Sequence, residues 1–299
     1  MDWKTIKTEE RNERTANIDA LSTIDMVRLI NDEDKKVALA VEQEAEHIAA
    51  AVDVIAAQLK AGGRLIYCGC GTSGLLGVLD AVECPPTYST DPDLVVGLIA
   101  GGYNARFRAV EGAEDDASLG EKDLKDINFS ARDVLVGIAA SGRTPYVLGA
   151  MDYARSVGAR VIGVTCCPGS LVTEAAEIAI APAPGPEVVT GSTRMKSGTA
   201  QKMVLNMLST GAMIKLGKVY GNLMVDVKPS NQKLVNRCQR IVSSAAEVDE
   251  DAARDALDQC GYRPKTAIVM LRLGVGAEEA KNLLEQSGGR VAMALERKA

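Results

Sequence analysis

The sequence predicts an α/β protein with a doubly wound, five-stranded parallel sheet, preceded by N-terminal helices and followed by a small helical region. Two observations carry this prediction. Short runs of Val, Ile and Leu alternate with segments of helical period between residues 64 and 217, and each run is continuously apolar. Continuous apolar strands separated by helices are typical of a parallel sheet that is covered on both faces.

The elements follow in order along the chain. Residues 1–30 are polar and predict a loose arm with a short helix near 22–29. One long amphipathic helix should follow the acidic segment 31–36 and run to about Leu59, where glycines end it. Strands are expected at 64–69, 94–102, 134–140, 160–166 and 178–182. Helices are expected at 75–83 (ended by Pro85 and Pro86), 104–118, 145–158, 171–177 and 193–217, with three short ones at 248–261, 265–274 and 277–289.

This pattern divides the chain into three expected parts. They are an arm and long helix (1–58), a phosphosugar-binding domain (59–238) and a small three-helix domain (239–299). In a parallel sheet, ligands bind beyond the carboxyl ends of the strands. The loops that follow the strands are therefore where functional residues should be sought.

Composition narrows the function classes. The 299 residues carry a net charge of −6, which argues against nucleic acid as a partner. No apolar run is long enough to cross a membrane and the first residues do not resemble a signal peptide, so we expect a cytoplasmic protein with no membrane partner. The seven cysteines match no disulfide or zinc spacing, and His47 is the only histidine. We expect no metal and no organic cofactor, and His47 on a helix surface, so proton chemistry falls to carboxylates, lysines or tyrosines.

Two strand-to-helix turns share one chemistry. GCGTSG (69–74) and SGRT (141–144) both offer glycines, hydroxyls and free N–H groups where a helix begins. Such turns bind phosphate through aligned amides and the helix dipole. The first turn lacks the Gly-Lys-Ser/Thr of a nucleotide P-loop. It matches G-x-G-x-x-G, but no acidic residue ends the next strand, which disfavours a dinucleotide.

Carboxylates near these turns are candidates for acid and base catalysis. Glu83 lies nine residues beyond the first turn, flanked by apolar residues and prolines. An apolar setting would raise its pKa and make it available as an acid near neutral pH. Glu111 and Glu114 are three residues apart and would share one face of the helix expected at 104–118.

Several long motifs resemble one known family. They are GTSG (71–74), DAVECPPTY (80–88), VVGLIAGG (95–102), AVEGAEDD (109–116), VGIAASGRTPYV (136–147) and the segment 187–227, with TEERN (8–12) and INDEDK (30–35) in the arm. Together they are similar to the N-acetylmuramic acid 6-phosphate etherases, from about residue 8 to the C-terminus. The resemblance implies the sugar isomerase (SIS) fold, which binds phosphosugars.

The resemblance implies a carbon–oxygen lyase that cleaves the lactyl ether at C3 of the sugar. The products would be N-acetylglucosamine 6-phosphate and D-lactate, formed by elimination and hydration during recycling of cell-wall amino sugars. The catalytic glutamates of the family correspond to Glu83 and Glu114. Glu83 would protonate the departing lactate and Glu114 would take the C2 proton, although the sequence alone leaves the two roles interchangeable.

The resemblance also implies substrate ligands. The phosphate would be bound by Thr72, Ser73, Gly74, Ser141, Arg143 and Thr144. Further contacts from 190–198 would come from Ser192, Arg194 or Lys196, with a salt-bridged helix start as the alternative for the two cations. The chain departs from the family in two places. Leu75 stands where an arginine is usual, and Tyr103 stands where many members have an acidic residue.

Two other functions are compatible with the same fold. A phosphosugar isomerase would share the C2 proton transfer, but such enzymes usually use a histidine for ring opening, and His47 lies in an N-terminal helix. A sugar-phosphate sensor similar to the glucokinase regulatory protein would have a chain about twice as long. Because SIS domains commonly pair, we expect a homodimer, with the apolar helices at 37–59 and 200–216 as candidate surfaces.

Overall fold

A computed structural model describes residues 7–108, 110–229 and 231–297. The first six residues of the predicted arm and position 109 of the AVEGAEDD motif lie outside the described residues. The chain forms two compact units. The first comprises Met1–Val82 and Asp93–Ser209, and the second Glu83–Pro92 and Thr210–Ala299. The predicted domain boundaries at 58/59 and 238/239 stay predictions.

The first unit contains the predicted five-stranded parallel sheet, in the order β2-β1-β3-β4-β5. The strands are β1 (Leu65–Gly69), β2 (Val95–Ile99), β3 (Val134–Ile138), β4 (Arg160–Val164) and β5 (Ile178–Ile180). The chain moves from β1 to β2 on one side and then returns past β1 to β3. The loops after β1 and β3 therefore leave the same edge in opposite directions, which opens a crevice between them.

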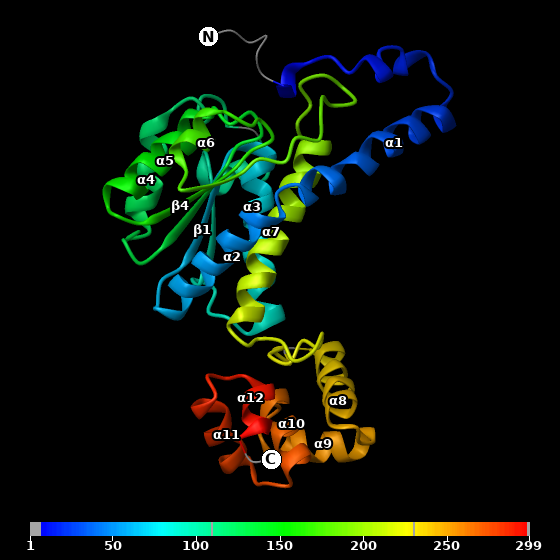
Figure 1. Ribbon diagram of the computed structural model, residues 1–299, viewed down its shortest axis with the longest axis vertical. Coiled ribbons are helices and arrows are strands. Elements are labelled where there is room, and N and C mark those ends of the chain that lie inside the picture. The colour runs from blue at the N-terminus through cyan, green and yellow to red at the C-terminus, as the bar shows by residue number, and fades with distance from the viewer. Residues whose placement is uncertain (1–6, 109, 230, 298–299) are drawn as a thin grey trace. The chain divides into compact units, whose positions relative to one another are not determined.

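Helices cover both faces of this sheet, as Figure 1 shows. One face carries α4 (Ala117–Asp126), α5 (Pro145–Ser156) and α6 (Leu171–Ala175), and the other carries α2 (Ala45–Lys60), α3 (Gly71–Tyr88) and α7 (Lys196–Lys215). All residues of β1 and β3 are buried, as continuous apolar strands require. The doubly wound fold class is confirmed.

The N-terminal region differs from its prediction. Three 3₁₀ turns at Lys7–Glu9, Glu13–Thr15 and Ile18–Ala20 form the arm, and the single long helix is instead two helices, α1 (Thr23–Glu42) and α2. Ser22 begins α1 early, because its side chain accepts a hydrogen bond from the Asp25 N–H. The break between α1 and α2 carries no Gly or Pro that could have predicted it.

Two further predictions between β1 and β3 are wrong. Helix α3 does not end before Pro85 and Pro86 but runs through both, because the fixed φ of proline is compatible with a helix when its missing N–H is tolerated. The helix expected at 104–118 is absent: η5 (Gly102–Arg106) is a 3₁₀ helix, and α4 begins only after Asp116 caps it. Glu111 and Glu114 therefore lie in a turn and share no helix face.

Beyond α7 the second unit contains five helices in the described part of the chain. They are α8 (Gln232–Ala246), α9 (Glu250–Gln259), α10 (Pro264–Leu273), α11 (Ala277–Gln286) and α12 (Val291–Glu296). The three helices expected there correspond to α9, α10 and α11. Ile268 and Val269 of the central α10 are fully buried in the core that these helices share. None of the described helices has the length and apolar character that crossing a membrane requires.

Candidate active site

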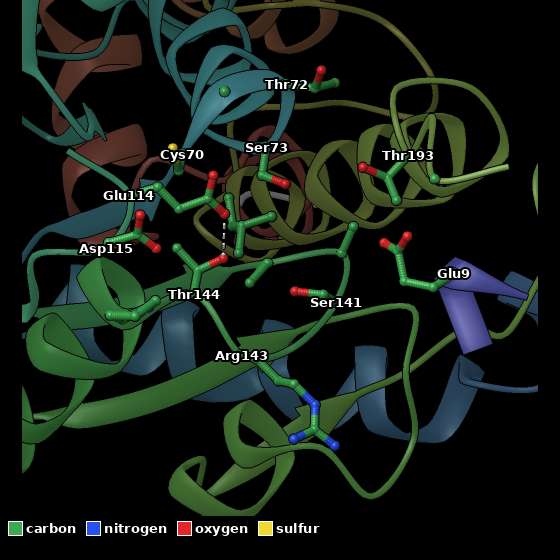
Figure 2. Close-up of a pocket in the computed structure, with 16 residues that line it drawn as sticks. Glu9, Cys70, Thr72, Ser73, Glu114, Asp115, Ser141, Arg143, Thr144 and Thr193 are labelled. Carbon is green, nitrogen blue, oxygen red and sulfur yellow. Dashed lines mark hydrogen bonds between the residues drawn. The ribbon is translucent and has the colours of Figure 1, made fainter. Parts of the chain in front are cut away.

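A cavity of about 620 Å³ lies at the carboxyl ends of β1 and β3, within the first unit. Five segments form its walls: the loops after β1 and β3, the turn at 112–115, the loop at 191–193 and the N-terminal arm. Figure 2 shows Ser73, Glu114, Ser141 and Thr144 around one space, while the side chain of Arg143 extends away from it. The cavity is where the crevice of a doubly wound sheet is expected.

The loop after β1 brings Thr72 and Ser73 into this cavity. In the described part of the chain, the N–H groups of both residues donate to no protein acceptor, as is usual in the first turn of a helix. Gly74 does not line the cavity. A Cβ at Gly74 would lie 2.6 Å from the Gly69 carbonyl oxygen, so the glycine lets α3 begin directly against the end of β1.

The loop after β3 contributes Ser141, Arg143 and Thr144. Among the described residues, no backbone or side-chain group accepts from the N–H groups of Arg143 and Thr144. Gly142 has a φ of +69°, and a Cβ there would lie 2.0 Å from Ser170 Oγ. Two helix starts with free amides, hydroxyls and one guanidinium therefore meet in one cavity, an arrangement that binds oxyanions.

Glu114 also lines the cavity, from the turn before α4. The Thr144 hydroxyl donates a 3.1 Å hydrogen bond to Glu114 Oε1, and the Tyr146 N–H donates to the Glu114 carbonyl at 3.1 Å. Burial, together with the neighbouring Glu114 carboxylate, raises the pKa of the Cys70 thiol to about 12. Cys70 therefore stays protonated beside a carboxylate that can act as a proton acceptor.

Glu9 is a lining residue to which the sequence analysis assigned no role. The arm that carries it is bound to the loop opposite by two hydrogen bonds, from Asn12 Nδ2 to Pro186 O (3.3 Å) and from Thr15 Oγ1 to Val188 O (2.8 Å). Glu9 and Asn12 lie within the TEERN motif. The motif was a signal that could have indicated a site residue, but nothing in the sequence places it beside loops more than sixty positions away.

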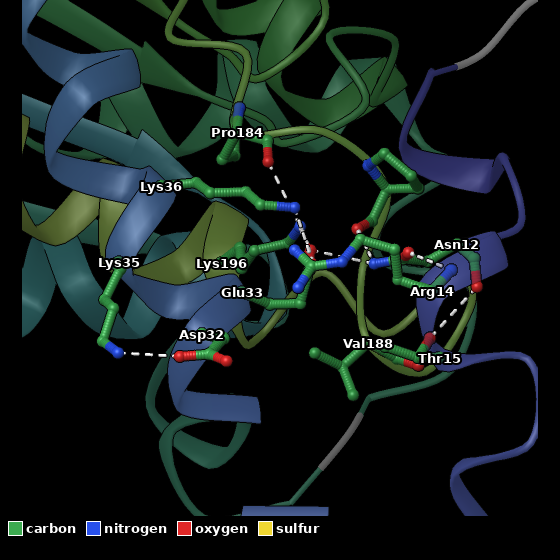
Figure 3. Close-up of polar contacts among 11 residues, drawn as sticks. Asn12, Arg14, Thr15, Asp32, Glu33, Lys35, Lys36, Pro184, Val188 and Lys196 are labelled. Carbon is green, nitrogen blue, oxygen red and sulfur yellow. Dashed lines mark hydrogen bonds and ion pairs between the residues drawn. The ribbon is translucent and has the colours of Figure 1, made fainter. Parts of the chain in front are cut away.

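Lys196 lies away from this cavity. Its side chain is 1% exposed, and its ammonium donates to Glu33 Oε2 (2.8 Å) and to Pro184 O (3.2 Å). Glu33, on α1, is equally buried and also accepts from Asn12, Arg14 and Lys36 (Figure 3). Lys196 begins α7 and forms a salt bridge there, and its predicted contact with the substrate stays a prediction.

Burial opposes ionisation of Glu33, but hydrogen bonds from Lys196, Lys36 and Asn12 outweigh it and lower its pKa to about 2. A second cavity of about 390 Å³ adjoins this network. Of the other residues expected at 190–198, Ser192 is half-buried and Arg194 is exposed, and neither lines the first cavity. Thr193, between them, does.

Glu83 is exposed and does not line the cavity that contains Glu114. The apolar setting expected from its neighbours is therefore wrong for the single chain. Helix period explains the difference, because Ala81 and Cys84 point inward from α3 while Glu83 points outward. Leu75, Leu79 and Val82 share that outward face and are 41%, 49% and 57% exposed. His47 is on the surface of α2, as predicted. Its ring nitrogen contacts Glu44.

Comparisons with known proteins agree with this geometry. A family model for the SIS domain matches residues 119–211, and one for the N-terminal SIS domain of the glucokinase regulatory protein matches residues 47–155. N-acetylmuramic acid 6-phosphate etherase from Photorhabdus laumondii is 61% identical over 282 residues, 94% of each chain. The chain belongs to the N-acetylmuramic acid 6-phosphate etherase family.

One more relative and one solved structure are also similar to this chain. The etherase from Photobacterium profundum is 59% identical over 99% of this chain and 98% of its own. A phosphoheptose isomerase structure from Neisseria gonorrhoeae aligns with a TM-score of 0.50 at 19% identity, covering 64% of this chain and 98% of its own. That similarity shows the fold alone, and it confirms the predicted SIS architecture.

Proposed function

We propose that this chain cleaves the C3 lactyl ether of N-acetylmuramic acid 6-phosphate, giving N-acetylglucosamine 6-phosphate and D-lactate. Membership of the etherase family supports the reaction, in which a carbon–oxygen bond is broken by a lyase. The observation that carries the proposal within the site is the position of Glu114: a carboxylate with one hydrogen-bonded oxygen in a cavity rich in free amides.

The chemistry needs a base, an acid and water. In the open-chain sugar, the C1 aldehyde acidifies the C2 proton. Glu114 removes that proton, the C3–O bond breaks, and an acid protonates the lactate oxygen as it leaves. Water then adds to the C2=C3 double bond, its oxygen to C3 and a proton to C2, which gives the hydroxyl of the product. Each positioned acid or base contributes on the order of 10²–10⁴ in rate.

The 6-phosphate is held away from the reacting carbons. Thr72 and Ser141 offer hydroxyls, whereas Ser73 donates its hydroxyl to Gln201 Oε1 (3.0 Å) and would serve the phosphate through its N–H. Among the described residues, the amides of Thr72, Ser73, Arg143 and Thr144 are free to donate. Arg143 supplies the positive charge, while Gly74 acts by permitting the helix start rather than by contact. Binding at the phosphate orients C2 against Glu114, so that affinity far from the reaction contributes to its rate.

A homodimer is the second part of the proposal. Leu75, Leu79 and Val82 form an exposed apolar stripe on α3, which is typical of a surface that another subunit covers. Leu75 replaces the arginine usual in the family and extends this stripe. Glu83 shares the face but not the cavity. The catalytic acid is then Glu83 of the partner subunit, delivered when the two α3 faces meet.

Cytoplasmic location is the third part. The seven cysteines are all free in the structure, including buried Cys68, Cys166 and Cys238. Unpaired thiols in this number suit a reducing compartment. A phosphorylated sugar is also a substrate that membranes retain inside cells, since a charged phosphate does not cross the bilayer unaided.

The test measures D-lactate released from N-acetylmuramic acid 6-phosphate in deuterated water. Wild type should release lactate and place deuterium at C2 of the product. Glu83→Ala should stop lactate release while C2 exchange continues, and Glu114→Ala should abolish both. A wild type that binds sugar phosphates without releasing lactate would sink the etherase assignment and favour a sensor, and interconversion of aldose and ketose phosphates would favour an isomerase.

Mixing the two inactive variants tests the dimer. If Glu83 acts across the interface, exchange of subunits between Glu83→Ala and Glu114→Ala creates dimers with one intact site. Activity should then rise toward about a quarter of wild type, because half the dimers are mixed and each has one of two sites complete. If the mixtures stay inactive although mass spectrometry shows mixed dimers, each active site uses Glu83 and Glu114 from the same chain.

A further inference from the structure

The Thr144 hydroxyl does not cap its own helix. Thr144 is the N-cap residue of α5 and is followed by Pro145 at the first helical position. A threonine there usually accepts a hydrogen bond from an N–H of the first turn. Thr144 makes no such bond, and its buried Oγ1 instead lies 3.1 Å from Glu114 Oε1 (Figure 2). An ionised carboxylate can only accept, so the hydroxyl donates its proton to Glu114.

The backbone makes the same connection. The Tyr146 N–H donates to the Glu114 carbonyl oxygen at 3.1 Å, so two residues at the start of α5 hold Glu114 by its side chain and its main chain. The turn that carries Glu114 has little support of its own. Gly112 has a φ of +76°, and its carbonyl accepts a long 3.3 Å bond from the Asp115 N–H. The orientation of Glu114 is therefore set mainly from α5.

We propose that Thr144 is a positioning residue for the base of the reaction, whose hydroxyl occupies Oε1 of Glu114 and leaves Oε2 to take the C2 proton. This inference rests on the proposed function. It also divides the roles of the loop after β3: Ser141 and Arg143 serve the phosphate with their side chains, whereas Thr144 serves it only through its N–H. Ser141 and Thr144 are separated by only three peptide bonds. The loop therefore fixes the position of the phosphate relative to the position of the base.

Other charged or titratable groups also lie near Glu114. The cavity contains the Cys70 thiol from the loop after β1, the Asp115 and Glu9 carboxylates, and the Arg143 guanidinium. A variant that changes only the hydroxyl of Thr144 leaves all four in place. The difference in kcat from wild type therefore reports the donated hydrogen bond.

The experiment compares Thr144→Val, Thr144→Ser and the matched control Ser141→Ala in the full chain, with kcat and KM for lactate release measured separately. Thr144→Val should lower kcat by roughly 10- to 100-fold with little change in KM, because misplacing a reacting group costs about that much. Thr144→Ser should restore kcat, because it keeps the hydroxyl. Ser141→Ala should instead raise KM with little change in kcat.

Exchange of the C2 proton in deuterated water gives a second readout, which should slow with kcat in Thr144→Val. Combining Thr144→Val with Glu114→Gln should add no further loss, since the base that Thr144 positions is already gone. A raised KM with an unchanged kcat in Thr144→Val would overturn the proposal and leave the hydroxyl as a phosphate ligand. If Thr144→Val does not fold, Thr144→Ala is measured against the same criteria. A wild type without lactate release would instead refute the proposed function itself.

Discussion

Two cavities of the first unit differ in whether their charged side chains have partners within the protein. Beside the smaller cavity, Glu33 is buried and accepts four hydrogen bonds, including those from Lys196 and Arg14. In the larger cavity, the side chains of Glu9, Asp115 and Arg143 form no hydrogen bond or ion pair with any other residue that the structure describes. Buried charges must be paired to be tolerated, whereas exposed charges need no internal partner. The paired, buried carboxylate of Glu33 therefore has a structural role, whereas the unpaired side chains of the larger cavity remain available to a ligand.

This contrast predicts that variants in the larger cavity change activity and variants at Glu33 change stability. The largest effect should follow Glu114→Gln, which removes the proposed base. We expect lactate release to fall on the order of 10²–10⁴-fold. The melting temperature should stay close to wild type because the side chain is exposed. Loss of stability comparable to the loss of activity would break the comparison.

The largest change in stability should follow Glu33→Leu. The ammonium of Lys196 would remain buried with only the Pro184 carbonyl as a partner. Removing one partner of a buried pair costs about 3–5 kcal/mol. Urea unfolding measures it, and Asp32→Ala provides the matched control, since Asp32 is the preceding residue and forms an exposed pair with Lys35. Asp32→Ala should leave the urea midpoint unchanged, and equal effects of the two variants would contradict the structural role of Glu33.

Acid should weaken the same network. The pKa of Glu33 is lowered from 4.5 to about 2 in the folded chain, so its contribution is complete above the unfolded value and is lost as pH falls from about 5 to about 2. The shift corresponds to on the order of 3 kcal/mol. Asp133 acts in the same direction and Asp80 in the opposite one. The contribution of Glu33 is therefore measured as wild type minus Glu33→Gln in urea titrations across this range, and a difference that does not shrink in acid would be inconsistent with it.

A smaller effect is expected for Arg143→Met. The guanidinium contributes to phosphate binding, and a hydrogen bond to a charged group is worth about 10- to 100-fold in affinity. KM should rise by that factor, with little change in kcat or in the melting temperature. Arg155→Met on the surface of α5 is the control, since the Arg155 side chain forms only a 3.9 Å ion pair with Asp152 among the described residues. An unchanged KM in Arg143→Met would remove Arg143 from the phosphate site.

The smallest effect is expected for His47→Ala. His47 is exposed on α2 and contacts only Glu44 among the described residues, so stability should change by less than about 0.5 kcal/mol. Lactate release should be unchanged. A tenfold loss of kcat would mean that the only histidine takes part in ring opening, as in the isomerases, and would require a second subunit to bring it to the cavity.

The sequence alone determined the features that depend on short stretches of chain. The strands are continuously apolar because both faces of a parallel sheet are covered, and the two turns that start α3 and α5 carry their glycines and hydroxyls within a few residues of each other. Both kinds of pattern are local, so β1 to β5 and the residues Thr72, Ser73, Ser141, Arg143 and Thr144 could be predicted to lie near one edge of the sheet. The catalytic role of Glu114 was implied by the family resemblance and not by its local sequence. The helix predicted at 104–118, which would have contained Glu114, is absent.

Only the tertiary structure decided which distant residues meet. Glu9 and Glu33 lie in motifs of the arm and α1 that carry no local sign of their role, and contacts with loops more than one hundred and fifty residues away bring them to their positions. The outward direction of Glu83 likewise depends on which face of α3 packs against the sheet. The burial and the partners of a side chain are set by packing between distant segments. Local sequence patterns do not show which distant segments pack together.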